Sequence, residues 1–254
     1  MITDNEIKNL HSLILDLGKE TEKIKKSNIK YVRKKDGSPF SMADKFVNEE
    51  INDFILKTNF KNIISEENKE IDFQTRKQWD FFWLVDPIDG TKDFIKKGKD
   101  YTINVALCEG NSPIFSLIYA PSRQSLYSAI KGNGAYLNGC EIKVNDSKKN
   151  KLNVVASKSH LNEETTAFIN KMKKKHNVNF VQYASSLKIC KIAEGEADIY
   201  PRFGPTMEWD TCAADLLLHE AGGSLTNLEK NKLIYNKNNL TNSYFICSSD
   251  TQLF

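Results

Sequence analysis

Apolar residues recur at helical spacing near the start of the chain. Ile7, Leu10, Ile14 and Leu17 fall on one side of a helix, so this pattern predicts an amphipathic helix over residues 4–26. A basic stretch at residues 30–35 is expected to be a connector. A second helical pattern follows, with its apolar residues again on one side: Phe46, Val47, Ile51, Phe54 and Ile55.

Continuous apolar runs predict buried strands in the next part of the chain. The clearest run is 81–85, and Ile63–Ile64 indicates a second, short strand. Strands are also expected on both sides of a Glu109–Ser112 turn and in the segments after it: 101–108, 113–119, 125–130 and 135–137. This spacing is typical of an antiparallel meander.

The pattern changes after the polar stretch 145–150, where strands and helices alternate. The expected elements are strands 152–156, 178–183, 197–200 and 243–248, and helices 162–174, 185–194 and 210–221. Such alternation favours an α/β layered half that follows an α+β half. We therefore predict an N-terminal α+β subdomain over residues 1–148 and a C-terminal α/β subdomain over residues 149–254.

Composition narrows the class of protein. A chain of 254 residues is long enough to bury a large core without disulfides or structural metals. The 36 basic and 33 acidic side chains are too evenly balanced to suggest nucleic-acid binding. Five scattered cysteines without a C-x-x-C pair favour a reducing compartment. With no apolar run of signal-peptide or membrane-spanning character, the expected location is the cytoplasm.

Two carboxylates lie three residues apart at the end of the apolar run 81–85. Asp86 is expected at the end of the strand, where Pro87 would turn the chain and bring Asp89 back toward the same point. Gly90 would let the backbone approach a ligand, and Thr91 would open a short helix with free N–H groups. Carboxylates and amides that converge in this way suit a divalent metal that bridges a phosphate to the protein.

Four other acidic residues strengthen this interpretation. Glu66 and Glu67 follow the predicted strand Ile63–Ile64, and Asp44 precedes the second helical pattern. Asp210 is expected at or near the N-cap of helix 210–221, where a carboxylate is favoured. Taken singly, each of these acids is also what a solvated turn or a helix cap would contain.

Taken together and in this order, the motifs at 38–44, 65–67, 86–91 and 209–214 resemble those of the inositol monophosphatase superfamily. Its members are Mg²⁺-dependent, lithium-sensitive phosphomonoesterases. Within it, the chain is most similar to the 3′(2′),5′-bisphosphate nucleotidases, which hydrolyse 3′-phosphoadenosine 5′-phosphate to AMP and phosphate. Four stretches carry this narrower resemblance: 83–94, 157–160, 185–188 and 200–205. It implies an α+β fold built as a layered α/β/α/β/α sandwich.

The resemblance also implies a metal site with two or three Mg²⁺ ions. The first ion would be held by Glu66, Asp86 and the carbonyl of Ile88, and the second by Asp86, Asp89 and Asp210. Two carboxylates about 4 Å apart repel each other by roughly 4 kcal/mol at an effective dielectric constant of 20, so such a cluster needs cations. Whether Glu67 also reaches a metal is left open.

Catalysis in the family pattern uses a metal-bound water and an Asp–Thr pair, which here would be Asp44 and Thr91. The amides of Gly90 and Thr91 would stabilise the phosphoryl oxygens, and Glu66 and Asp210 would also touch the substrate. Four further residues match positions that hold the 5′-phosphate and the nucleoside: His160, Ser185, Lys188 and Arg202.

Two other classes of function compete with the nucleotidase. One is a phosphatase of the same superfamily that acts on inositol monophosphate or a sugar bisphosphate. The other is a nucleotide sensor without turnover, which the presence of both Asp44 and Thr91 disfavours. The expected partner is a small-molecule substrate, with neither nucleic acid nor an integral membrane segment. Monomer and homodimer both stay open, because members of the superfamily are found as either.

Overall fold

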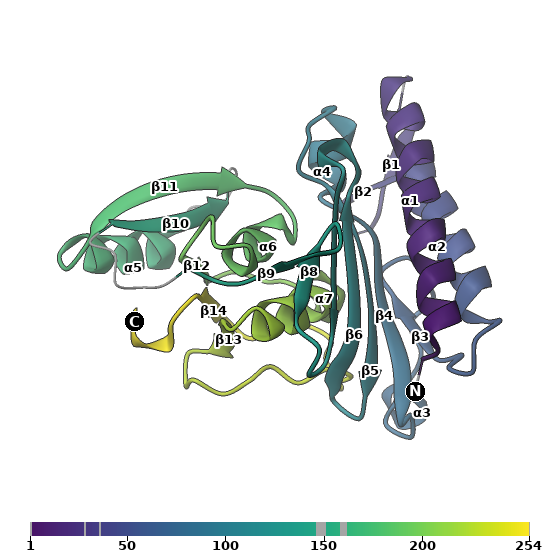
Figure 1. Cartoon of the computed structure of the whole chain (residues 1–254). Helices are drawn as coiled ribbons and strands as arrows, with labels where there is room; N and C mark the ends of the chain where they lie inside the picture. The colour runs from purple at the N-terminus through teal and green to yellow at the C-terminus, as the bar shows by residue number, and fades with distance from the viewer. Residues whose placement is uncertain (1, 28, 36, 146–150, 158–161, 254) are drawn as a thin grey trace.

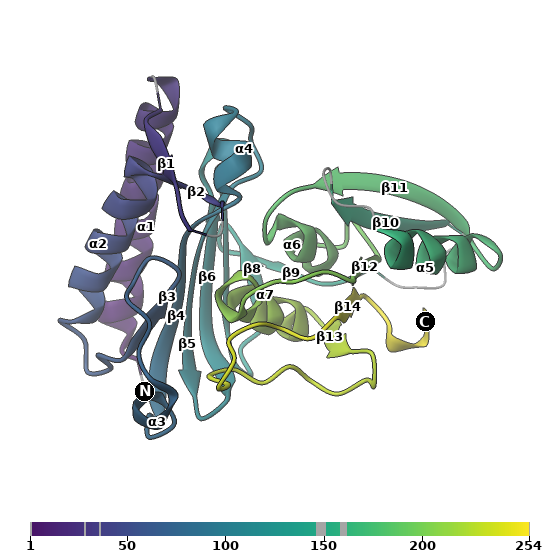
Figure 2. The same ribbon diagram turned by 180° about the vertical axis from the view of Figure 1, so that it is seen from behind.

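Five alternating layers of helix and sheet make up the computed structural model, which describes residues 2–27, 29–35, 37–145, 151–157 and 162–253. The outer layer α1 (Asp4–Lys26) and α2 (Met42–Ile55) covers one face of a seven-stranded sheet (Figure 1). Figure 2 shows α6 (Leu187–Ala193) and α7 (Glu208–Glu220) between this sheet and a five-stranded one. Helix α5 (Glu163–Lys173) covers the far side of the second sheet. The expected α/β/α/β/α sandwich is confirmed.

The seven-stranded sheet has the order β3-β4-β5-β6-β7-β8-β9. Its strands are β3 (Ile63–Ser65), β4 (Phe81–Asp89), β5 (Thr102–Glu109), β6 (Ser112–Ala120), β7 (Ser125–Ile130), β8 (Ala135–Leu137) and β9 (Cys140–Ile142). Strand β3 pairs with β4 in parallel, and every other pair is antiparallel. The meander expected from the sequence is therefore present.

The five-stranded sheet has the order β11-β10-β12-β14-β13. Its strands are β10 (Lys151–Ser157), β11 (Asn177–Tyr183), β12 (Ile199–Arg202), β13 (Ser224–Asn227) and β14 (Phe245–Ser248). Strand β10 is parallel to β11 and β12, whereas β14 is antiparallel to β12 and β13. The strands from Ile63 to Ile142 belong to the seven-stranded sheet and those from Lys151 onward to the five-stranded one, while the division into subdomains 1–148 and 149–254 stays a prediction.

Alternation along β4 places its side chains in two different cores. Trp83 and Val85 are buried against α1 and α2, whereas Phe82 and Leu84 are buried against α6 and α7. Both faces are apolar because both are covered by helices, which is why this strand has an unbroken apolar run. Packing on both faces therefore fixes β4, whose last residues include Asp86 and Asp89.

Several smaller elements complete the fold. They are β1 (Tyr31–Arg33), β2 (Pro39–Ser41), α3 (Phe73–Arg76), α4 (Thr91–Ile95) and two 3₁₀ turns, Pro121–Arg123 and Thr251–Leu253. The connector expected at 30–35 is wrong, because β1 pairs with β2 in an antiparallel hairpin. All three residues of β1 are exposed, so no apolar alternation marks it in the sequence. None of the described helices is both long and apolar enough to cross a membrane.

Several expected boundaries differ from the structure by one or two residues, and three differences lie near the acidic residues. The turn expected at Pro87 is wrong, because β4 continues to Asp89 through a shift of register against β5 between Asp86 and Asp89. Helix α6 begins two residues later than expected, at Leu187, and α7 begins two residues earlier, at Glu208. These differences move the acidic residues relative to the element ends, as described below.

Candidate metal centre and phosphate site

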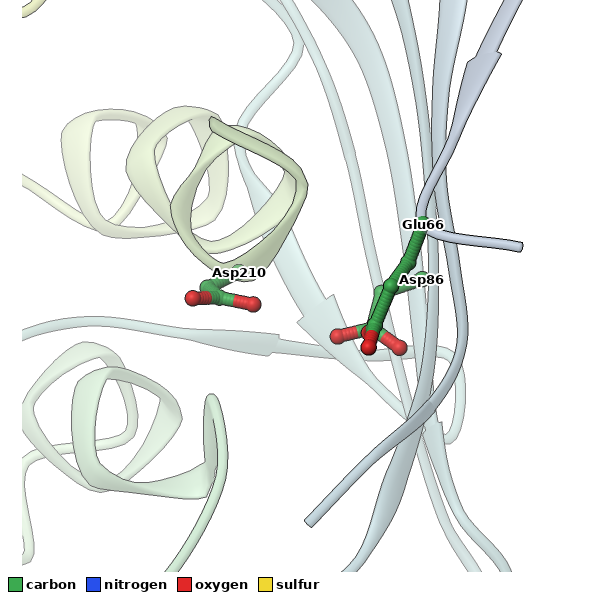
Figure 3. A group of neighbouring side chains, drawn as sticks. All are labelled: Glu66, Asp86 and Asp210. Carbon is green, nitrogen blue, oxygen red and sulfur yellow. The ribbon is translucent and has the colours of Figure 1, made fainter. Parts of the chain in front are cut away.

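Three carboxylates from two layers meet at one point. Glu66 follows β3, Asp86 lies on the neighbouring strand β4, and Asp210 lies on α7. One carboxylate oxygen of each lies within 4.8 Å of the others. Figure 3 shows Asp210 on its helix facing the other two side chains across the gap between helix and sheet. The packing of α7 on the sheet therefore assembles a group of ligands that are far apart in sequence.

The electrostatics of this group fit a divalent cation. Asp86 is 1% exposed, and its Oδ1 accepts a hydrogen bond of 3.1 Å from the Ile88 amide. Its Oδ2 is buried without a hydrogen-bond partner among the described residues. Burial, and then the charges of Glu66, Asp89 and Asp210, raise the pKa of Asp86 well above its ordinary range. Clustered, undersolvated carboxylate oxygens are what Mg²⁺ or Ca²⁺ would neutralise.

Asp210 is positioned by its own helix start. The N-cap of α7 is Met207 and Asp210 is the third helical residue, so Asp210 lies near the N-cap, as expected, but not at it. There its Oδ2 accepts a hydrogen bond of 2.8 Å from the Met207 amide, which orients the carboxylate. Burial, and then the nearby charge of Asp89, raise the pKa of Asp210 to about 7.

Asp89 lies beside this group but outside the three-carboxylate cluster. Its Oδ2 accepts hydrogen bonds from the Ser186 amide at 2.6 Å and from the Asn104 side chain at 3.4 Å. Its charge contributes to the raised pKa of both Asp86 and Asp210. Asp89 is therefore close enough to act with them electrostatically.

Asp44 and Thr91, which the sequence pairs for catalysis, are in contact. The Thr91 hydroxyl is 3.1 Å from Asp44 Oδ1 and 3.0 Å from the Ile88 carbonyl, and both oxygens can accept its proton. Asp44 Oδ2 accepts hydrogen bonds from the amide and the hydroxyl of Ser41 at 2.8 and 2.5 Å. Ser41 is the N-cap of α2 and Asp44 its third residue, so a capping box fixes this carboxylate. The alternative of Asp44 as the N-cap itself is wrong.

Gly90 connects the end of β4 to α4, the helix that begins with Thr91. It is the N-cap of α4 and has a left-handed backbone, with φ of 89°. A Cβ at this position would lie 3.2 Å from the Asp100 carbonyl and 3.4 Å from Cβ of Ser185. Glycine is therefore favoured by both the backbone conformation and the close approach of two chain segments.

The pattern in the sequence gave no indication of Lys34, which follows β1. Its Nζ lies 2.8 Å from Glu66 Oε1 and 2.6 Å from Glu67 Oε1. Glu67 is thus paired with Lys34 and is not in the three-carboxylate group; burial raises its pKa to about 7. The β1–β2 hairpin brings Lys34 to these acids. Nothing in the local sequence of a basic stretch indicates which of its lysines will make such a contact.

A small cationic cavity of about 100 Å³ adjoins the carboxylates. Ser185, Lys188 and Arg202 line it together with Asp89 and Asp210. Lys188 is 9% exposed, and burial lowers its pKa to about 8. These residues are therefore close enough to the carboxylate group to act on one ligand.

The cationic side chains are held by neighbouring backbone carbonyls. Lys188 Nζ donates a hydrogen bond of 2.7 Å to the Ser185 carbonyl. Arg202 Nη2 donates one of 2.8 Å to the Pro205 carbonyl, while its Nε is buried without a partner among the described residues. Ser185 has a left-handed backbone and precedes α6, so its expected place at the helix start is corrected. His160 lies outside the described residues.

The chain is also similar to known proteins in sequence and in fold. Residues 6–252 match the model of the inositol monophosphatase family. The 3′(2′),5′-bisphosphate nucleotidase CysQ of Salmonella typhimurium is 36% identical over 213 residues, which cover 82% of this chain and 83% of that protein.

Two solved structures extend the comparison. CysQ from Bacteroides thetaiotaomicron, a bacterial member of the family, has a TM-score of 0.84 at 37% identity and covers 93% of this chain and 94% of its own. An IMPase/NADP phosphatase solved with Mg²⁺ and phosphate has a TM-score of 0.81 at 19% identity, over 96% of this chain and 90% of its own. The second likeness concerns the fold alone.

Proposed function

The chain belongs to the inositol monophosphatase family, and from this premise we propose that it is a Mg²⁺-dependent 3′(2′),5′-bisphosphate nucleotidase. Its substrate would be 3′-phosphoadenosine 5′-phosphate, and its products AMP and phosphate. The 36% identity to the 3′(2′),5′-bisphosphate nucleotidase CysQ of Salmonella typhimurium, over 82% of this chain, supports this substrate. The observation that carries the proposal is the contact between the carboxylate group, which could bind a phosphate through a metal ion, and the cavity that contains Lys188 and Arg202; the two regions share Asp210.

A metal-binding group beside a cavity with two basic side chains fits a substrate with two phosphates. Glu66, Asp86 and Asp210 would hold the cation that binds the scissile phosphate. Lys188 and Arg202 are the cations of the adjoining cavity, and their N–H groups suit the oxygens of a second phosphate. Ser185 would add a hydroxyl to this phosphate, and His160 is proposed as a contact of the nucleoside. A substrate with one phosphate would leave the second region unused.

Mg²⁺ would supply charge neutralisation and a lower pKa for bound water when it occupies the site. We propose two or three ions per site, with the Ile88 carbonyl and Asp89 as the remaining ligands. Asp89 is already oriented by the Ser186 amide. The Ile88 carbonyl lies 3.0 Å from the Thr91 hydroxyl, and because a carbonyl oxygen has two lone pairs it can also bind a metal.

The Asp44–Thr91 pair would position and deprotonate the attacking water. Because Thr91 donates its proton to Asp44, the lone pairs of its oxygen are free to accept a hydrogen bond from water. Asp44 is in turn fixed by Ser41, so the pair is oriented before a substrate arrives. The Gly90 and Thr91 amides would stabilise charge on the phosphoryl oxygens.

The deciding experiment measures phosphate release from 3′-phosphoadenosine 5′-phosphate and from inositol 1-phosphate, each with Mg²⁺ and with EDTA. We expect Mg²⁺-dependent release from the nucleotide, inhibited by lithium, and much less from the inositol ester. A preference for the inositol ester would keep the metal chemistry and overturn the proposed substrate. Release that continues in EDTA would overturn the metal dependence, and no release from either would favour the sensor.

A further inference from the structure

A buried polar network joins the segment after Glu66 to the start of α7. Its members are Arg76, Asn236, Lys237 and Glu208, and we call it the Arg76–Glu208 network. Arg76 is 1% exposed, Asn236 6% and Glu208 0%. Polar groups this deeply buried are costly unless they are fully paired, so such a network holds its members rigidly.

At one end, Arg76 fixes two chain segments to each other. It is the last residue of α3, and its Nε donates a hydrogen bond of 2.8 Å to the Ile71 carbonyl. Its Nη1 donates to Asn236 Oδ1 at 2.6 Å and to the Lys237 carbonyl at 3.1 Å, and its Nη2 lies 3.4 Å from the Asn238 carbonyl. The planar guanidinium therefore clamps residues 71–76 against residues 236–238, about 160 positions later.

At the other end, Glu208 ties the same loop to α7. Its Oε2 accepts a hydrogen bond of 2.5 Å from the Asn236 amide, and its Oε1 accepts one of 3.0 Å from the Lys237 amide. Lys237 Nζ forms an ion pair with Oε1 at 2.5 Å. Glu208 is the first residue of α7, and Asp210 follows two residues later.

We propose that Arg76 and Asn236 are positioning residues that set the distance between the Glu66 and Asp210 carboxylates. Glu66 begins the segment that ends at Arg76, and Asp210 lies in the first turn of the helix that Glu208 starts. Arg76, Glu66, Asn238 and Trp209 also line one cavity of about 510 Å³, so the network adjoins the metal site. Like-charged carboxylates drift apart unless they are held, and supporting contacts of this kind tune cation affinity.

The sharpest test is Asn236→Gly. Asn236 has a left-handed backbone with φ of 63°, which glycine adopts without strain. The hydrogen bond from the backbone N–H at this position to the Glu208 carboxylate is retained. The change removes both side-chain bonds to Arg76, from Nη1 to Oδ1 and from Nδ2 to the Arg76 carbonyl at 2.7 Å. It therefore weakens the link between the two halves, because across this link Arg76 keeps only its bonds to the Lys237 and Asn238 carbonyls, and it leaves both ends of the network in place.

Asn138→Gly is the matched control. Asn138 also has a positive φ, of 49°, and also makes two side-chain bonds, from the Leu126 amide and to the Gln124 carbonyl. It lies in the turn between β8 and β9. Both variants exchange the same residue types and lose two side-chain hydrogen bonds. The lost bonds are buried at Asn236 and exposed at Asn138, so Asn236→Gly should lower the thermal stability more, while Asn138→Gly controls for the exchange of asparagine for glycine.

The measurement is isothermal titration of each substrate-free protein with Mg²⁺. We expect Asn236→Gly to weaken Mg²⁺ binding by about tenfold, and Asn138→Gly to bind like the wild type. Arg76→Lys keeps the charge but not the fork, and it is expected to weaken Mg²⁺ binding in the same way. Unchanged Mg²⁺ affinity in folded Asn236→Gly and Arg76→Lys would overturn the inference.

The inference rests on the proposed metal-dependent function, and the same titration separates the two. A wild-type protein that binds no Mg²⁺ would overturn both. A wild-type protein that binds Mg²⁺ and hydrolyses the nucleotide, together with an Asn236→Gly variant of equal affinity, would overturn only the role of the network.

Discussion

Asp210→Asn is expected to stabilise the metal-free protein while it weakens Mg²⁺ binding. Asparagine has the same shape as aspartate, and its side-chain oxygen can still accept the hydrogen bond from the Met207 amide. The change removes one of several negative charges that repel each other at the site. In the absence of a cation, the loss of this charge repulsion is the main effect on the free energy of unfolding.

The size of the effect follows from the pKa of Asp210, which rises from its ordinary value of 3.8 to about 7. Each pKa unit corresponds to about 1.4 kcal/mol, so the ceiling is about 4 kcal/mol. Partial exposure of the carboxylate reduces this, and we expect about 2–4 kcal/mol. The folded state holds the proton more tightly than the unfolded state. The wild type therefore loses stability as the pH rises from about 4, and the loss is complete above about 7.

Thermal unfolding followed by circular dichroism in EDTA would measure this effect. At pH 8 the variant should melt roughly 5–12 °C above the wild type, and near pH 4 the two should be close. With saturating Mg²⁺ the wild type should gain stability by mass action, and the variant should gain much less. A variant less stable than the wild type in EDTA at pH 8, or a gain that does not depend on pH, would refute the reasoning.

Three further changes test other parts of the structure. Thr91→Val should lower kcat by about 10²–10³ and leave Mg²⁺ affinity intact, while Thr91→Ser keeps activity; an active valine variant would remove the hydroxyl from the mechanism. Lys188→Met should raise the KM for 3′-phosphoadenosine 5′-phosphate about tenfold but not that for 3′-AMP. Because the pKa of Lys188 is about 8, the wild-type KM for the bisphosphate should rise above pH 8, and a flat profile would count against this role. Gly18→Ala would place Cβ 2.2 Å from Tyr119 Cε1. It should therefore cost about 1–3 kcal/mol in urea unfolding, despite a helix-propensity gain of about 1 kcal/mol, and unchanged stability would contradict the packing.

The parts of the site that the sequence predicted are those with a local signal. Asp86 and Asp89 follow an apolar run that must be a buried strand, and the resemblance of four motifs fixed the partners Glu66 and Asp210. The pairing of Asp44 with Thr91 came from the same resemblance, and the structure brings the two into contact. The local hydrophobic pattern and the family motifs together were therefore enough to predict the layers of the fold and the acidic residues of the site.

The parts that the sequence did not predict depend on long-range partners. Lys34 looks like any solvated lysine until the β1–β2 hairpin carries it to Glu66. Arg76 looks like a surface arginine at a helix end, but a loop 160 residues later encloses it. Asp210 has the residue type of an N-cap, yet Met207 takes that position because the backbone of α7 starts two residues earlier. Helix ends and buried cations are decided by tertiary contacts that no local window contains.

The central position of α7 also determines when this chain can finish folding on the ribosome. The sheet face that carries Phe82, Leu84 and Ile118 is complete once β9 has been made, at Ile142, but its cover is α6 and α7, which ends at Glu220. At about 5–20 residues per second, the nascent sheet presents an uncovered apolar face for several seconds. During that interval a chaperone, or the same face of a neighbouring nascent chain, can bind this apolar face. The last third of the polypeptide then has to displace it before α6 and α7 can pack.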